Sequence, residues 1–161
     1  MKLLAAAGLA LAAASPEAVP HQLDMMAFFT GNTHADNVIR ITLHGPHKLI
    51  VDSVGGKNKE GEFLLIDTVR EEGKPVRKRI WVMHAVSPGH FTGTLSDAAG
   101  PVDVQIDGDS VTIRYTMTEG HLAIVQQMQL QADGRSLSNH AVAKRFGITF
   151  AHVDGTVRKL D

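Results

Sequence analysis

The sequence predicts an all-β protein, an antiparallel up-and-down β-barrel of about eight to ten strands with a short N-terminal helix. The first observation behind this is a series of short period-2 segments between residues 34 and 160, separated by turn-forming Gly, Pro, Asn and Asp. The second is that no segment suits the helical crossover that parallel strands require. Closing such a meander into a barrel removes the open edges of the sheet, so a barrel is favoured over a sandwich.

The pattern is clearest in residues 77–117, which contain the only Trp and the only Tyr of the chain, Trp81 and Tyr115. Alternating segments cover residues 77–86, 90–95, 102–106 and 111–117. Between them lie Ser87-Pro88-Gly89, a turn around Gly100 and Asp107-Gly108, all of which favour tight hairpins.

The other elements follow from local signals. Gln22–Phe29 lacks β-branched residues and is followed by Gly31, which predicts one or two helical turns that plug one end of the core. Strands are expected at 38–43, 48–54 and 62–70. Residues 121–130 and 137–146 fit a helix or a strand, and Asp133-Gly134 between them favours strands. The last strand is expected at 148–153, continuing to 160 past a kink at Gly155.

The N-terminus has a different composition. Lys2 precedes an unbroken Leu, Ala and Gly run from Leu3 to Ala14, which ends in the small residues that signal peptidase requires. About 12 apolar residues are fewer than the roughly 20 that span a bilayer. We therefore expect a signal peptide over residues 1–18 and one barrel domain over residues 22–161. The expected product is a soluble periplasmic protein.

Composition excludes several functions. The net charge of -1 argues against a nucleic-acid or anionic-membrane binder in general, and 5% aromatic residues argue against a stacking platform for single strands. The chain has no Cys, so it has neither disulfides nor thiol chemistry.

Several motifs occur together in one order: Phe28-Phe29-Thr30-Gly31, Arg79-Ile80-Trp81, Phe91-Thr92-Gly93-Thr94, Tyr115 and residues 139–147. In this order they resemble the bacterial envelope family called domain of unknown function 3833, from about Leu23 to Leu160. The resemblance implies a lipocalin-like barrel, often made as a lipoprotein, and no settled activity. It adds Asn139 and Lys144, in the closing motif, to the candidate ligand-binding residues.

The chain departs from the resembled family at two points. Gln126-Gln127-Met128 stands where members tend to carry an acidic pair followed by Trp. No Cys is present to take a lipid anchor. Any binding role of the acidic pair therefore does not carry over to this chain.

Arg79 is the most specific functional candidate. On a strand it shares a face with Trp81, so if Trp81 points into the barrel, Arg79 does too. A buried Arg needs a partner, which can be a ligand group, a carboxylate of the protein or water. One interpretation is an Arg and aromatic cavity for an amphipathic anion, and the other is an Arg stacked on Trp81 that closes the barrel end. Tyr115 is either core or cavity lining.

Catalytic and metal sites are not expected. The nine His residues are scattered, and His44 and His47 flank a turn without a nearby carboxylate. No Ser lies in a Gly-x-Ser-x-Gly elbow, and Asp97, Asp103, Asp107 and Asp109 fit turn and surface positions. We therefore expect no enzyme activity, no metal and no cofactor.

Together these observations predict a protein that binds a small apolar or amphipathic molecule inside the barrel. The predicted ligand-binding residues are Arg79, Trp81, Tyr115, Asn139 and Lys144. The alternative is a structural or interaction protein of the cell envelope with a filled barrel, and a less favoured one is an enzyme that uses His and Asp at the barrel mouth. The interior volume distinguishes a binding protein from a filled barrel.

Overall fold

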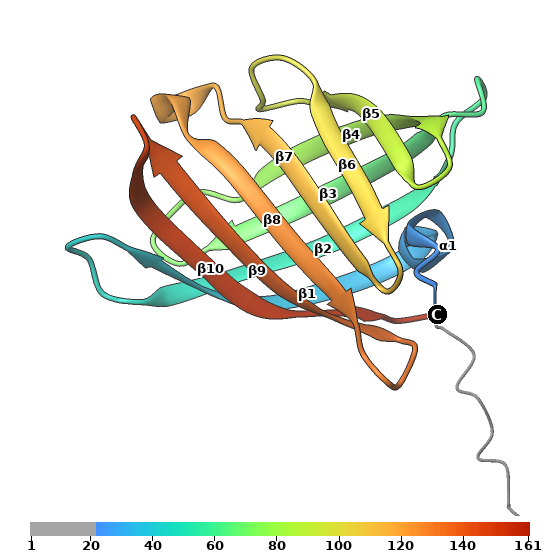
Figure 1. Ribbon diagram of the computed structural model, residues 1–161. Coiled ribbons are helices and arrows are strands. Elements are labelled where there is room, and N and C mark those ends of the chain that lie inside the picture. The colour runs from blue at the N-terminus through green and yellow to red at the C-terminus, as the bar shows by residue number, and fades with distance from the viewer. Residues whose placement is uncertain (1–21) are drawn as a thin grey trace, which may run out of the picture.

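The computed structural model describes residues 22–161, which form a closed barrel of ten antiparallel strands with one short helix (Figure 1). The expected all-β barrel is therefore confirmed. The elements are α1 (Met25–Phe29), β1 (Gly31–Ile41), β2 (His47–Lys57), β3 (Phe63–Glu71), β4 (Arg77–Ser87), β5 (His90–Leu95), β6 (Val102–Asp107), β7 (Ser110–Thr116), a 3-10 turn at Glu119–His121, β8 (Ala123–Leu130), β9 (Ser136–Arg145) and β10 (Ile148–Lys159).

Each strand pairs with its neighbours in sequence, and β10 closes the barrel by pairing with β1. This pairing runs from Thr33 opposite Lys159 to Ile41 opposite Ala151. Next to it, the backbone N–H of Asn32 donates to the Asp161 carboxylate at 3.0 Å. All ten strands therefore have a hydrogen-bonded neighbour on both sides.

The start of the first strand differs from expectation, whereas the later strands agree with it. The first strand begins at Gly31, earlier than expected. Its inward-facing residues there include the buried polar residues Thr33 and Asn37, so the sequence did not show the apolar alternation that predicts a strand. The ambiguous segments 121–130 and 137–146 are strands, as predicted. β10 runs through Gly155 without a change of register on either side, so the last strand continues past this residue as predicted.

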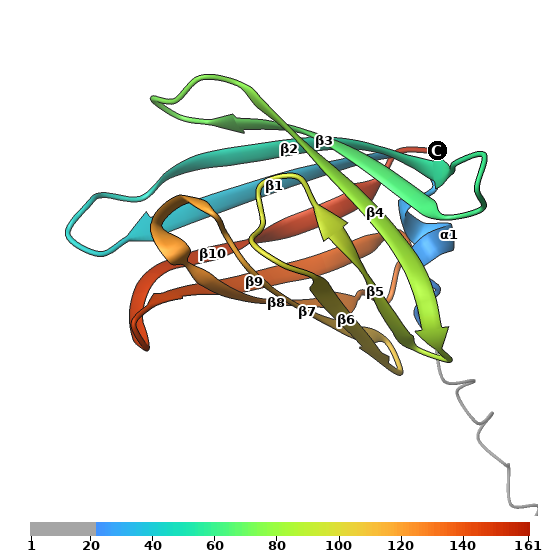
Figure 2. The same cartoon turned by 90° about the horizontal axis from the view of Figure 1, so that it is seen from above.

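Helix α1 covers one end of the barrel (Figures 1 and 2). It begins after Asp24, whose carboxylate accepts a hydrogen bond from the Ala27 N–H at 2.9 Å and thereby caps the helix. Met25, Phe28 and Phe29 are buried in the core cluster. The helix is shorter than Gln22–Phe29, and it packs its apolar side chains into the barrel as expected.

The opposite end of the barrel is less tightly filled, and we call it the open end. It carries the β1–β2, β3–β4, β5–β6, β7–β8 and β9–β10 connections (Figure 2). Along β1 the inward residues Thr33, Ala35 and Asn37 are buried, whereas Ile39 and Ile41 are only partly so. Side-chain burial therefore decreases from α1 toward the open end.

The contact between α1 and β2 depends on Gly55. A Cβ atom at this position would overlap the backbone oxygen of Phe29, while a Cβ at Gly56 would meet nothing within 4 Å. We expect Gly55→Ala to lower the free energy of unfolding by about 1–3 kcal/mol, because α1 must shift. Gly56→Ala is the matched control on the same strand. Urea denaturation measures both, and equal effects would contradict this role of Gly55.

Candidate ligand-binding site

The barrel interior contains a cavity of about 100 Å³ between α1 and the layer that holds Arg79. Met25 and Phe29 of α1 form part of its wall, and most of the remaining wall is apolar. Polar side chains from six strands also face this cavity: Asn37, Ser53, Asp67, Arg79, Gln126 and Asn139. A polar set of this size is unusual in a protein core, where an unpaired polar group is costly.

Asp67 is the most deeply buried charged group of the cavity, with 6% of its surface exposed. It shares the inward face of β3 with Leu65 and Val69. Its carboxylate accepts hydrogen bonds from Trp81 Nε1 at 2.8 Å and from Ser53 Oγ at 2.7 Å. Burial raises the pKa of Asp67 above its usual value, and these two hydrogen bonds oppose the rise.

Arg79 finds its partners within the protein. Its Nε donates to both carboxylate oxygens of Asp97, at 3.0 and 2.9 Å, and Nη2 donates to the Tyr115 hydroxyl at 3.2 Å. The guanidinium also lies over the rings of Trp81 and Tyr115, 5.2 and 5.4 Å from their centroids. Of the three partners left open by the sequence, the structure provides a protein carboxylate, together with stacking on Trp81.

The charges of this layer do not balance. Asp67 and Arg79 are opposite each other in the β3–β4 ladder, and Asp97 binds the same guanidinium from the β5–β6 connection. The guanidinium thus faces two carboxylates when Asp67 is ionised. This layer then contains two carboxylates and one cation, so its net charge is negative and its carboxylate oxygens can accept further hydrogen bonds.

A row of side-chain amides crosses the cavity on the other side. Gln126 Nε2 donates to Asn139 Oδ1 at 2.8 Å, and Asn139 Nδ2 donates to Asn37 Oδ1 at 2.8 Å. Asn139 and Asn37 lie on β9 and β1, and Gly155 of β10 pairs with both of them. A Cβ at Gly155 would overlap the Asn37 amide oxygen. The missing side chain of Gly155 therefore lets the two amides meet across a strand.

The predicted ligand-binding residues fall into two groups. Arg79, Trp81 and Asn139 line the cavity, and Tyr115 holds Arg79 from just outside it. Lys144 is exposed on β9 near the open end, away from the other four. A ligand-binding role for these residues stays a prediction.

Sequence reasoning missed four of the polar cavity residues: Asn37, Ser53, Asp67 and Gln126. One signal was available. Asp67 is two residues from Leu65 and from Val69 and four from Phe63, so on a strand it shares the inward face of these apolar residues.

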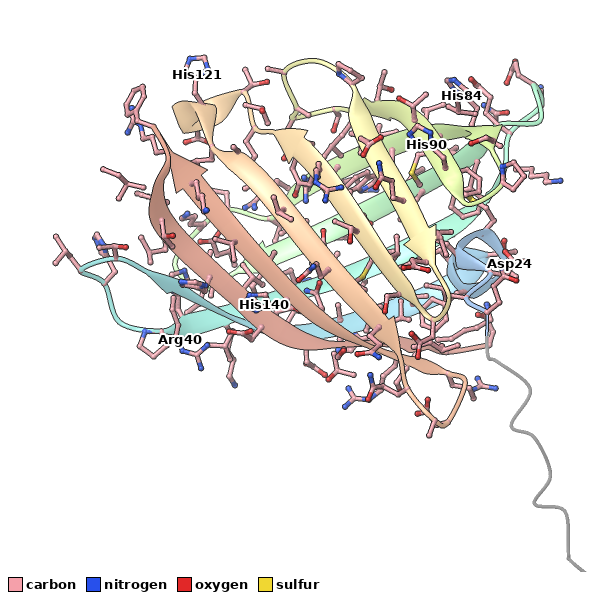
Figure 3. All side chains as sticks on the ribbon, viewed as in Figure 1. Asp24, Arg40, His84, His90, His121 and His140 are labelled. Atoms are coloured by element: carbon pink, nitrogen blue, oxygen red, sulfur yellow. The ribbon has the colours of Figure 1, made fainter. Side chains whose placement is uncertain are left out.

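The His residues within the described part of the chain lie apart from the cavity, since none of them lines it. Figure 3 shows His84, His90, His121 and His140 on the outside of the barrel. Within residues 22–161 no group of three or more His, Asp or Glu side chains could hold a metal ion. In the same part of the chain, no helix has the length and apolarity to cross a membrane.

The chain matches one family of proteins over most of its length. The model of a family described as protein of unknown function (DUF3833) matches residues 4–159. The chain belongs to the DUF3833 family. The resemblance seen in the sequence is thus confirmed, and no curated protein matches this DUF3833 chain.

Three solved structures are similar to the DUF3833 barrel. S-type phycobiliprotein lyase CPES from Guillardia theta has a TM-score of 0.67 and 6% identity, over 86% of this chain and 92% of that one. Rv2717c from M. tuberculosis has a TM-score of 0.58 and 11% identity, over 84% and 94%. A protein of unknown function from the DUF3598 family of Nostoc punctiforme PCC 73102 has a TM-score of 0.60 and 9% identity, over 88% of this chain and 51% of that longer one. These likenesses show a lipocalin-like fold.

The buried carboxyl of Asp67 gives a pH-dependent prediction. Between its usual pKa and its raised pKa in the barrel, the folded protein binds a proton that the unfolded chain has released. This carboxyl therefore makes stability fall as pH rises through that window. Asp67→Asn keeps a neutral group of the same shape, so the stability of the variant relative to the original should increase with pH above about 4.

Urea denaturation over a pH series measures this difference. Glu60→Gln, at an exposed carboxyl in the β2–β3 connection, is the control. A difference between Asp67→Asn and the original protein that stays constant or shrinks as pH rises would refute the argument.

Proposed function

We propose that the chain binds a small amphipathic molecule inside the barrel. The observation that carries this proposal is the convergence of polar side chains from six strands on one interior cavity. A barrel built only for structure is more stable with apolar side chains at such positions. Ligand sites, in contrast, combine an apolar wall with a few polar groups that orient the ligand.

The cavity volume limits the size of the ligand. About 100 Å³ is less than the roughly 300–1,000 Å³ of sites for drug-sized molecules. Met25, Met83 and Met128 form part of the wall, and Met side chains change rotamer easily. The proposed ligand is therefore a small molecule, or the end of a longer one, for which these side chains make room.

The charges favour a ligand that donates hydrogen bonds. Asp97 already neutralises Arg79, and Asp67 adds a second carboxylate beside the cavity. When Asp67 is ionised, it repels an anion strongly, because the interior has a low dielectric constant. An amine or alcohol with an apolar tail complements both the acceptors and the Met-rich wall.

We further propose that the role is binding and not catalysis. Within residues 22–161 no His lines the cavity, so the Ser53 hydroxyl has no His beside it that could act as a base. This hydroxyl donates to the Asp67 carboxylate instead. The similar lyase has a TM-score of 0.67, which supports a common fold, and its 6% identity gives no support for a common activity.

Native mass spectrometry of protein purified from its own cells, combined with thermal shift assays, tests the proposal. The shift assays compare short-chain alkylamines, alcohols and carboxylates as probes. We expect a bound small molecule, and a higher melting temperature with amines or alcohols than with carboxylates. The absence of both a bound molecule and a thermal shift would overturn the proposal.

A matched pair of variants locates the site. Asn37→Leu, Gln126→Met and Asn139→Leu together remove the amide row without leaving a donor or acceptor of that row unpaired on either side of β9, and should abolish the shift. Gln127→Met and Gln129→Met change exposed amides on the outer face of β8 and should leave it intact. An unchanged shift in the first variant would place binding elsewhere.

For the location of the protein, we propose the periplasm. The support is the composition of residues 1–18, which lie outside the described residues. Fusing these residues to a phosphatase that is active only after export tests this: phosphatase activity is expected, and its absence would refute export.

A further inference from the structure

We propose that the open end of the barrel docks onto an anionic lipid bilayer through the tips of the β1–β2 and β9–β10 hairpins. This inference is independent of the proposed ligand. It begins from two large apolar side chains in the turns, Leu43 and Phe146, which are 99% and 89% exposed. Ile148, at the start of β10, is 74% exposed. Side chains of this kind gain nothing from the barrel core.

The backbone conformation makes these positions more unusual. Leu43 has φ 66° and Phe146 has φ 50°, a left-handed region that Gly and Asn occupy at much lower cost than bulky residues. Local preference therefore disfavours Leu and Phe twice, once by exposure and once by conformation. A large apolar residue that is both exposed and in a left-handed conformation, without stabilising the fold, indicates a function.

The two hairpins belong to one unit of the barrel. Their inner strands, β1 and β10, are paired, and beyond the last paired residues the Thr42 N–H still donates to the Phe150 oxygen at 2.9 Å. Both tips extend from the same end of the barrel, opposite α1, and diverge from each other (Figures 1 and 2). They are therefore two separate apolar points rather than one flat patch.

The charged residues within the two hairpin tips all have one sign. Residues 40–48 contain Arg40 and Lys48, residues 143–152 contain Lys144 and Arg145, and neither segment contains Asp or Glu. Arg40 pairs with Asp154, further down β10, at 2.9 Å, and the Arg145 guanidinium lies 5.5 Å from the ring centroid of Phe146. Within residues 22–161, Lys144 and Arg145 make no ion pair.

The neighbouring β3–β4 hairpin extends this pattern in part. It presents Val76, which is 62% exposed, between Lys74 and Arg77. The tip of this hairpin has two acidic residues. Glu71 is buried and pairs with Lys74, Arg77 and His47. Glu72 is exposed at the base of the hairpin turn and accepts a hydrogen bond from the Lys48 N–H. Exposed acids lie at both ends of the barrel, Glu72 and Glu119 at the open end and Glu60, Asp107 and Asp133 around α1, so the uniform positive charge is confined to the β1–β2 and β9–β10 hairpin tips.

An anionic bilayer matches these features better than a protein partner does. Interfacial anchors combine apolar side chains that enter the headgroup region with Lys and Arg that attract anionic lipids. A protein interface of ordinary size buries about 800 Å² per partner as one continuous surface, which two diverging tips do not offer. The overall charge of -1 disfavours general membrane binding, so the attraction is local to the open end.

Vesicle flotation tests this inference. One set of vesicles contains equal parts phosphatidylcholine and phosphatidylglycerol, and the other contains phosphatidylcholine alone. We expect the full chain to float with the anionic vesicles, more weakly as salt increases, and not with the neutral ones. Absence of binding, or equal binding to both sets, would overturn the inference.

Variants then separate the tips from the rest of the chain. Leu43→Asn with Phe146→Asn places Asn where its left-handed preference suits the turn, so folding is retained while vesicle partition falls by about tenfold or more. Val86→Asn with Leu160→Asn changes two apolar residues that are 56% and 61% exposed and lie toward the α1 end, and should bind as before. All variants keep the same N-terminal segment. Equal binding by both variants would refute the inference.

A fluorescence measurement checks the orientation. Because the chain has no Cys, a single His44→Cys or Arg135→Cys can carry an environment-sensitive dye at either end. We expect a blue shift with anionic vesicles for the dye at position 44 and none at position 135. The reverse result would refute the orientation. A dimer that depends on Leu43 and Phe146, without vesicle binding, would assign these tips to a second copy instead and overturn the proposal.

Discussion

Removing both carboxylates that face Arg79, in Asp67→Asn with Asp97→Asn, is expected to lower the free energy of unfolding by about 3–5 kcal/mol. The Arg79 side chain is 14% exposed, and its charge is compensated by these two groups. Either single variant leaves one carboxylate beside the guanidinium. The double variant leaves a buried cation without a counterion, so its loss should exceed the sum of the two single effects.

A double-mutant cycle in urea measures this coupling, which we expect to be about 0.5–3 kcal/mol. Adding Arg79→Met to the double variant removes the unpaired charge and should recover much of the lost stability. Additive single effects would show that Asp67 does not compensate Arg79.

Trp81→Ala is the second variant with a large expected effect, a loss of about 3–5 kcal/mol. Trp81 is 6% exposed, packs edge-on against Tyr115 with 5.6 Å between ring centroids, and donates to Asp67. Truncation removes this packing and leaves a void next to the cavity. Trp81→Phe keeps most of the packing and removes the N–H, at about 1–3 kcal/mol.

Indole provides a specific check on the void. Apolar cavities made by truncation bind small aromatic molecules, so indole should raise the melting temperature of Trp81→Ala and leave the original protein unchanged. No shift for the variant would show that the barrel interior collapses into the space that the indole ring vacates. Equal shifts for both proteins would show that indole binds at a site other than this void.

The architecture could be predicted because its signals are local. Alternation gives each strand an inward face. The hairpin signal Asp133-Gly134 identified residues 121–130 and 137–146 as strands, although their own composition also fits helices. The start of β1 was missed for a physical reason. Its inward residues include Thr33 and Asn37, so the stretch did not show the apolar alternation that marks a half-buried strand.

The site was only half predictable. The shared face of Arg79 and Trp81 follows from their spacing. The partner of Arg79 is Asp97, which lies in a turn, where strand alternation does not predict the direction of a side chain. Asn37 and Asn139 are 102 residues apart and meet only because the barrel closes around Gly155. Contacts of this kind depend on register across several strands, which a single sequence does not specify.

Closure of the barrel by β1 and β10 also has a consequence for biosynthesis. The bond between Asn32 and Asp161 joins residues 129 apart, and contacts of such long range make folding slow, on the order of milliseconds to seconds. A growing chain keeps one side of β1 unpaired until residues 148–159 emerge. Throughout that interval it presents a free strand edge on which other chains can aggregate. The last strand to be synthesised removes both edges in one step.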